Sequence, residues 1–203
     1  KSKLKLLINL MKIYGEEKFY NMKKPNIYGG GAQTNKNGLA FEQTTSLDSA
    51  LEATGYNVMD NRVYREGQYI GISASKYAFY QKFLSPNGID YQTINSKKWL
   101  PDEAFINEEK KTVYIIEKKF QNVSGSVDEK LPNCHFKKLE YEKLCHPIGY
   151  QVEFIYVLSD WFRSPIYRDT LEYIQMMGCT YFYNEIPLQA LGLASVCAAF
   201  GVE

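Results

Sequence analysis

Two β-favouring segments, residues 101–106 and 112–121, constrain the fold of this chain more than any other feature of its sequence. They are separated by a polar connection, 107–111, whose length suits a hairpin between antiparallel strands. The pattern therefore predicts an antiparallel strand pair near the middle of the chain.

Charged side chains interrupt the second of these strands at its end. Because side chains alternate across a strand, Glu117, Lys119 and Gln121 share one face, whereas Lys118 lies on the other. Folding the hairpin brings Asp102 opposite the neighbourhood of Glu117, so that two carboxylates and one ammonium group converge. Two carboxylates suit Mg²⁺, which also keeps several waters. A lysine beside them is suited to contact a scissile phosphate and to orient the attacking water.

The pair Pro101-Asp102, followed after fourteen residues by Glu117-Lys118-Lys119, resembles the PD-(D/E)XK nuclease motif. This resemblance implies an α/β fold with a restriction-endonuclease-like core, in which helices flank a central mixed β-sheet in the order α-β-β-β-α-β. It also implies a Mg²⁺-dependent, site-specific DNA endonuclease, most like a type II restriction endonuclease or its nicking or subunit relatives. The expected product carries a 5′ phosphate.

The remaining elements of this core follow in the same order along the chain. We expect a first helix over 39–54, a first strand over 56–64, and then the two strands of the hairpin. A second helix over 133–145 and a strand over 151–158 complete the core. An insertion at about 66–98 separates the first two core strands.

The resemblance also implies roles for individual residues. Asp102 and Glu117 would bind the metal, and Glu42, on the opening helix, would assist it directly or through water. Lys119 would position or activate the nucleophile, and Gln121 would support the site as part of a Glu-x-Lys-x-Gln variant. The implied cofactor is Mg²⁺, with Mn²⁺ as an alternative ion.

Double-stranded DNA is the partner that the resemblance implies, either with a two-fold homodimer or with a partner subunit. Lys137 and Lys138 on the second helix could reach phosphate, although a solvated helix face also explains each lysine. Side chains able to read base edges lie between the first strand and Trp99: Asn61, Arg62, Arg65, Gln68, Lys76 and Gln81.

Three other interpretations remain open. A nuclease of the same fold could act on branched or damaged DNA in repair or recombination. A catalytically silent module could bind DNA or another subunit. Finally, the motif could arise by chance, with Asp102 as a turn residue, Glu117 and Lys119 as a solvated strand pair, and Glu42 as ordinary helix surface.

Composition bounds these interpretations. The 203 residues are 45% hydrophobic, which suits a single domain with an N-terminal helix and Gly-rich loop (1–37), a catalytic core (38–158) and a C-terminal elaboration (159–203). A formal net charge of +1 argues against a uniformly cationic nucleic-acid binder. No apolar run approaches the length of a membrane span, and the stretch 4–13 lacks a cleavage pattern, so we expect a cytoplasmic protein.

The four cysteines are few and irregularly spaced, which favours reduced thiols. Cys134-His135 and Cys145-His146 lack the paired short spacings of a structural zinc site. We interpret them as buried thiols beside histidines at helix ends.

Overall fold

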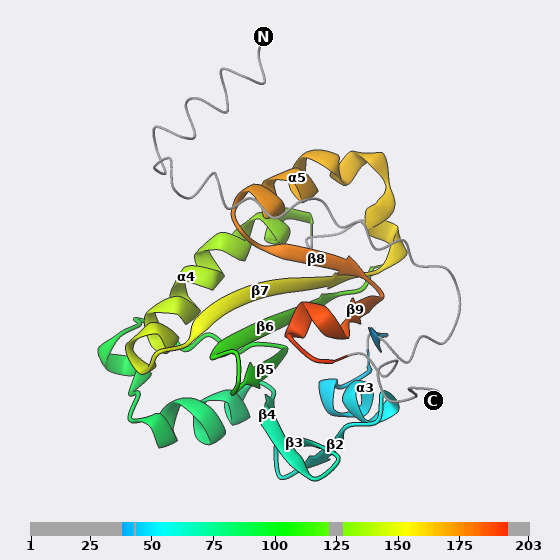
Figure 1. The fold of residues 1–203 in the computed structure, drawn as a ribbon. Coiled ribbons are helices and arrows are strands. Elements are labelled where there is room, and N and C mark those ends of the chain that lie inside the picture. Colours follow the sequence, from blue (N-terminus) through cyan, green and yellow to red (C-terminus); the bar gives the residue numbers. More distant parts are fainter. Residues whose placement is uncertain (1–37, 43, 122–127, 195–203) are drawn as a thin grey trace, which may run out of the picture.

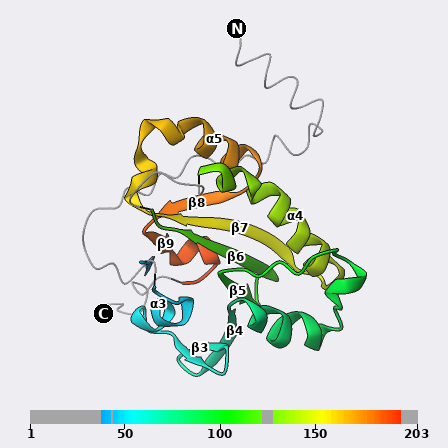
Figure 2. The same cartoon turned by 180° about the vertical axis from the view of Figure 1, so that it is seen from behind.

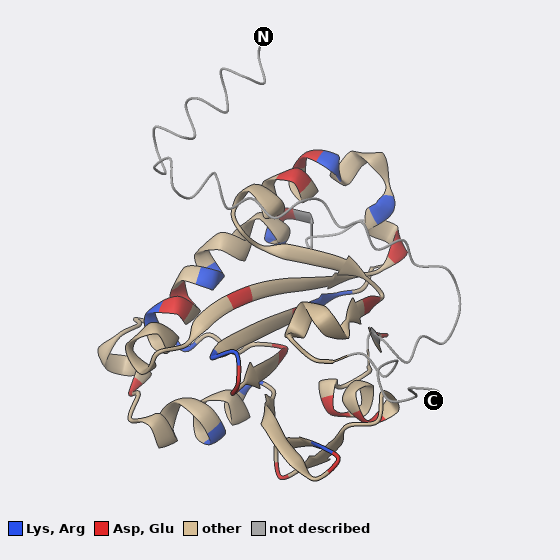
Figure 3. Cartoon of the chain, in the orientation of Figure 1, with Lys and Arg blue, Asp and Glu red and all other residues tan. Residues whose placement is uncertain are grey.

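The computed structural model describes residues 38–42, 44–121 and 128–194. The helix and the Gly-rich loop expected within 1–37 lie outside these residues. In the described part, a seven-stranded sheet forms the centre of the molecule, and helices cover both of its faces (Figure 1). Charged residues of both signs are interspersed over the elements (Figure 3), consistent with the balanced composition.

The sheet has the strand order β2-β3-β4-β5-β6-β7-β8, so strands that follow one another in sequence are also neighbours in space. The strands comprise β2 Asn57–Met59, β3 Arg62–Arg65, β4 Gln68–Ala74, β5 Glu103–Asn107, β6 Thr112–Lys119, β7 Gln151–Leu158 and β8 Thr180–Tyr183. A separate antiparallel pair comprises β1 Gly38–Ala40 and β9 Glu185–Pro187. The α-helices of the described residues are α3 Leu47–Ala53, α4 Cys134–Cys145 and α5 Arg168–Met176.

Short helical segments connect these elements. They comprise Phe79–Leu84, Ser85–Asn87, Tyr91–Thr93, Asp128–Asn133, His146–Ile148, Asp160–Arg163, Pro165–Tyr167 and Leu188–Leu191.

The sheet is mixed. Strands β2 to β6 pair antiparallel, whereas β6, β7 and β8 are parallel. Parallel neighbours need a crossover connection, and α4 and α5 lie in the two crossovers. Elements α3, β4, β5, β6, α4 and β7 reproduce the predicted order, which confirms a mixed α/β sheet flanked by helices.

Alternating side chains of β6 divide the core into two layers. Val113 and Ile115 pack with α4, α5 and the segment Phe79–Leu84 on one face. Tyr114 and Ile116 pack with α3 and with residues 188–193 on the other face. Figures 1 and 2 show α4 and α3 on opposite sides of the sheet. The predicted division of the strand into two faces is therefore confirmed.

The helix expected over 39–54 is wrong in its first part, because α3 begins only at Leu47. The side chain of Ser46 caps this helix by accepting a hydrogen bond from the Ser49 N–H group. Upstream, the segment Gly38–Ala40 pairs with β9 instead. Helix propensity contains no information about a strand partner that lies more than 140 residues away.

The single first strand expected over 56–64 is also wrong, because this segment forms most of the β2–β3 hairpin. Asp60 and Asn61 lie between the two strands with φ values of 48° and 65°. Asp and Asn tolerate this left-handed conformation, which a two-residue hairpin turn requires. The strand that pairs with β5 is β4, so the insertion expected at about 66–98 begins only after Ala74.

Gly71 allows β4 and β5 to approach each other closely. A Cβ atom at this position would overlap the main-chain oxygen of Ile106 and lie 3.0 Å from its carbonyl carbon. No other residue type fits here without moving one of the strands, because only glycine lacks the Cβ atom.

Downstream of the hairpin, the predicted elements agree closely with the structure. The strand predicted over 151–158 is β7, and the second helix predicted over 133–145 is α4.

None of the helices in the described ranges combines the length and the apolarity that crossing a membrane requires.

Candidate active site

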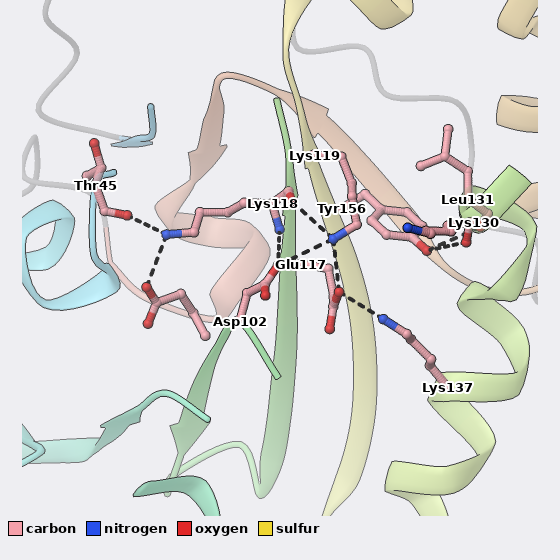
Figure 4. Close-up of polar contacts among 10 residues, drawn as sticks. Thr45, Asp102, Glu117, Lys118, Lys119, Lys130, Leu131, Lys137 and Tyr156 are labelled. Atoms are coloured by element: carbon pink, nitrogen blue, oxygen red, sulfur yellow. Dashed lines mark hydrogen bonds and ion pairs between the residues drawn. The ribbon is translucent and has the colours of Figure 1, made fainter. Parts of the chain in front are cut away.

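The ends of β5 and β6 bring two carboxylates and a lysine together. The register pairs Glu103 with Ile116, so the adjoining positions 102 and 117 also face each other. Lys119 Nζ lies 3.3 Å from Asp102 Oδ2 and 3.0 Å from Glu117 Oε2 (Figure 4). One ammonium group therefore bridges both acids, and all three side chains lie on one face of the sheet.

Burial differs among these three side chains. Glu117 retains 4% of its side-chain exposure and Lys119 retains 16%, whereas Asp102 retains 37%. Asp102 Oδ2 also accepts a hydrogen bond of 3.0 Å from the main-chain N–H of Lys118. The acid before β5 is therefore held by the main chain and still faces solvent, which leaves an approach for a substrate.

Lys118 points to the opposite face, as the alternation predicts. Its ammonium group donates to the Thr45 carbonyl oxygen at 2.7 Å and to Glu103 Oε1 at 3.2 Å. Burial raises the pKa of Glu103, and the neighbouring Lys118 opposes that rise. Neighbouring lysines thus have separate surroundings: Lys118 fastens β6 to the loop before α3, and Lys119 lies among the acids.

A second ammonium group enters the site from α4. Lys137 Nζ lies 2.9 Å from Glu117 Oε2, the same oxygen that Lys119 contacts (Figure 4). The sequence predicted a phosphate contact for Lys137 but not this ion pair. Its spacing indicates that it lies on the face of α4 that packs on the sheet. Lys137 lies three residues after Cys134 and four before Tyr141, both of which are buried.

An aromatic ring borders the polar cluster. Lys119 Nζ lies 5.9 Å from the centre of the Tyr156 ring, and the Tyr156 hydroxyl donates to the Leu131 carbonyl oxygen at 3.2 Å. Burial raises the pKa of Tyr156, and the negative charge of Glu117 adds to this rise. The hydroxyl therefore stays protonated at neutral pH, and this ring acts as an uncharged wall of the site.

Glu42 does not lie on the opening helix, which corrects the expectation. It lies in the loop between β1 and α3, where its main-chain N–H donates to Thr45 Oγ1 at 3.1 Å. Its side chain is exposed, and among the described residues its carboxylate has no hydrogen bond or ion pair. The geometry thus brings Asp102, Glu117 and Lys119 together but leaves Glu42 apart from their network.

Gln121 lies two residues beyond the end of β6 and is buried. Its main-chain N–H donates to Ser159 Oγ at 3.2 Å, and its carbonyl oxygen accepts from that hydroxyl at 3.1 Å. Ser159 directly follows β7. These bonds hold the C-terminal ends of β6 and β7 together close to Lys119.

The residues expected to contact DNA have different surroundings. Arg62 and Lys76 are exposed, and the Lys76 N–H donates to the Pro101 carbonyl oxygen, next to Asp102. Arg65 instead donates to the Tyr56 hydroxyl at 3.2 Å and to the Ala194 carbonyl oxygen at 2.8 Å. Lys138 Nζ donates to the Gly178 carbonyl oxygen. Arg65 and Lys138 thus hold structural contacts within the protein.

Asp102 and Glu117 offer hard oxygen donors that suit a divalent ion completed by water and by phosphate oxygens. In the described part of the chain, no three His, Cys, Asp or Glu side chains gather in a metal-binding arrangement.

Cys134, Cys145 and Cys179 are buried free thiols, which confirms the expectation for these three.

A mixed sheet that carries two acids and a lysine at the ends of adjacent strands defines a restriction-endonuclease-like α/β fold. The family model described as PD-(D/E)XK nuclease superfamily domain matches residues 33–145, which is more than half of the chain. This chain therefore belongs to the PD-(D/E)XK nuclease superfamily. Searches of curated proteins and of solved structures found no significant match.

Membership of this superfamily indicates a nuclease with DNA as its substrate. Nucleases of the superfamily generally use divalent metal ions. The match carries nothing specific to type II restriction endonucleases.

Proposed function

We propose that this protein is a Mg²⁺-dependent endonuclease that hydrolyses phosphodiester bonds of double-stranded DNA and leaves a 5′ phosphate. The observation that carries the proposal is the bridge from Lys119 Nζ to both Asp102 and Glu117. Two acids beside a lysine are the groups that metal-assisted hydrolysis of a phosphate ester needs.

Each residue of the network has a separate role in this proposal. Asp102 and Glu117 would hold Mg²⁺, or Mn²⁺ in its place, and the ion would supply positive charge that acidifies water and polarises phosphate. Lys119 orients the attacking water and stabilises charge that develops on the phosphate. Gln121 holds the C-terminal end of β6 beside the end of β7 through its main-chain hydrogen bonds to Ser159. Glu42 would complete the metal shell through water, which requires its exposed loop to approach the site.

Contacts with the DNA backbone follow from the basic residues around this site. We assign phosphate contacts to Lys76 and Lys137, because the Lys76 main chain adjoins Asp102 and Lys137 adjoins Glu117. Arg62 is exposed and suits a contact farther along the duplex. Arg65 and Lys138 would have to give up internal hydrogen bonds to reach DNA, so we rank them behind the other three.

We assign residues 1–203 to a single nuclease domain and place the protein in the cytoplasm, where DNA and Mg²⁺ are both available. Type II restriction is our first candidate for the biological role. Each protomer offers one hydrolytic site, so cleavage of both strands of a palindrome would use a two-fold homodimer or a partner subunit.

A repair or recombination nuclease is the second candidate, and the exposed ring of Phe136 beside the partly buried ring of Trp99 favours it. The ring of Phe136 is 53% exposed, and its centre lies 5.6 Å from that of Trp99. Lys97 Nζ lies 4.5 Å from the Trp99 ring. Phe136 directly precedes Lys137 on α4. Rings of this kind stack on unpaired bases.

Plasmid and phage DNA incubated with Mg²⁺, and then analysed by gel electrophoresis and end sequencing, test the primary proposal. We expect discrete fragments with 5′ phosphate ends, abolished by EDTA and by Asp102→Asn. Cleavage confined to flaps, junctions or mismatched duplexes would favour the second candidate. DNA binding without any cleavage in Mg²⁺ or Mn²⁺ would instead indicate a catalytically silent module.

A further inference from the structure

Lys137 occupies a position on α4 where an apolar residue is expected. The helix packs on the sheet through Cys134, Tyr141 and Leu144, which recur at helical spacing and are buried. Lys137 belongs to the same stripe, and its side chain retains 22% exposure. A lysine on a core-facing stripe costs free energy unless its charge has a partner, and here the partner is Glu117.

Both ammonium groups of the site use one oxygen atom. Lys119 and Lys137 contact Glu117 Oε2 at 3.0 and 2.9 Å. A divalent ion bound to this carboxylate would meet two positive charges at contact distance, and at least one of them would have to withdraw. Lys119 has other acceptors, Asp102 Oδ2 and the Lys118 carbonyl oxygen. Among the described residues, Glu117 is the only partner of Lys137.

Charge balance leads to the same conclusion. Asp102 and Glu117 carry two negative charges, and Lys119 and Lys137 carry two positive charges, so the four side chains sum to zero. A divalent ion therefore leaves the site with an excess of positive charge, and a DNA phosphate brings in negative charge.

We propose that Lys137 occupies the metal-binding carboxylate of Glu117 in the free protein and transfers to a phosphate oxygen of the DNA when a divalent ion binds. This inference rests on the proposed function and extends it, because it makes metal binding and phosphate binding mutually dependent through one side chain. The same lysine thus weakens metal binding in the absence of DNA and strengthens catalysis in its presence.

Mn²⁺ binding to the free protein tests the first half of the inference. Titrations followed by electron paramagnetic resonance compare the wild type with Lys137→Met and with Lys143→Met. Lys143 is a matched control, because it also lies on α4 and also pairs with a carboxylate, that of Glu140. We expect Lys137→Met to bind Mn²⁺ about threefold to tenfold more tightly, the range for losing a partly buried competing contact. Lys143→Met should stay within about twofold of the wild type.

Cleavage at saturating Mg²⁺ tests the second half. We expect kcat of Lys137→Met to fall about a hundredfold, as for the loss of one donor to a reacting phosphate, although the metal binds more tightly. Lys137→Arg keeps the positive charge and should keep wild-type Mn²⁺ affinity. Should Lys137→Met fail to fold, as judged by circular dichroism, Lys137→Gln replaces it with the same expected results.

The possible outcomes separate this inference from the proposed function. Unchanged or weaker Mn²⁺ binding in the neutral variant would overturn the competition, and an unchanged kcat would overturn the transfer to phosphate. Absence of cleavage by the wild-type protein on every DNA would remove the nuclease proposal and the transfer step, whereas the Mn²⁺ titration would still decide whether Lys137 competes for Glu117.

Discussion

Replacing Lys118 by methionine removes the ammonium group that fastens β6 to the loop before α3. This group bonds the Thr45 carbonyl oxygen and Glu103, and the two paired side chains retain only 14% and 10% exposure. Breaking a buried ion pair costs about 3–5 kcal/mol, because the remaining charge is left without compensation. Since Glu103 keeps some contact with solvent and can take up a proton, we expect Lys118→Met to cost about 2–4 kcal/mol near neutral pH.

The cost should depend on pH with a definite sign. Burial raises the pKa of Glu103 above its ordinary value of 4.5, so the folded protein binds this proton more readily than the unfolded chain. Protonation therefore stabilises the folded state, and stability falls as pH rises through the folded-state pKa. Removal of Lys118 takes away the group that opposes the raised pKa, so the penalty should shrink between pH 7.5 and pH 5. Lys118→Met combined with Glu103→Gln should recover about half of the loss at pH 7.5.

Urea unfolding followed by circular dichroism measures these free energies, and plasmid cleavage is measured on the same samples. Lys119→Met is the matched comparison. It should change the free energy of unfolding by less than about 1 kcal/mol, because Lys137 still pairs with Glu117 and the Lys118 N–H still bonds Asp102. Its cleavage should fall at least about a thousandfold. The reverse pattern, with Lys118 needed for cleavage and Lys119 for stability, would mean that the faces of β6 are exchanged and would contradict the roles assigned to the two lysines.

Single substitutions and an exchange of the metal ion test the packing of the sheet, the DNA contacts and the role of the metal. Gly71→Ala should destabilise the fold by about 2–4 kcal/mol in thermal melts, because its Cβ atom overlaps the main chain of β5. Gly67→Ala, in an open turn at φ 79°, should cost only about 1 kcal/mol. Arg62→Ala should weaken DNA binding in gel shifts and leave the melting temperature unchanged, whereas Arg65→Ala should lower the melting temperature through its lost Tyr56 and Ala194 contacts. Ca²⁺ in place of Mg²⁺ should support binding without cleavage, and cleavage at an undiminished rate in EDTA would contradict a metal-dependent mechanism.

Local sequence patterns predicted a large part of this fold. Alternation along β6 predicted which of Lys118 and Lys119 shares a face with Glu117, because the two-residue repeat of a strand is a property of its backbone. The limits of β7 followed from one apolar run bounded by turn residues. The hairpin that carries Asp102 could be found for the same reason, since its strands and its connection are adjacent in the sequence.

Contacts between distant segments lay beyond such patterns. The β1–β9 pair joins residues about 147 positions apart, for example Leu39 and Ile186. Because residues 38–40 pair with β9, the helix begins only at Leu47 and Glu42 lies in the loop before it. Neither strand has enough residues to be recognised alone, because each is stabilised mainly by the partner that the fold brings to it.

Alternation along one strand predicted the shared face of Glu117 and Lys119, and the resemblance to the PD-(D/E)XK motif implied the α/β class and the order of the core elements. Neither pattern could show that Glu42 lies outside the polar network or that Lys137 lies inside it, because both positions depend on packing between distant segments. The reason is physical: the position of a side chain on its own element is set by nearby residues, whereas its partners depend on how α4 packs across the sheet and where the chain before α3 finds a strand to pair with.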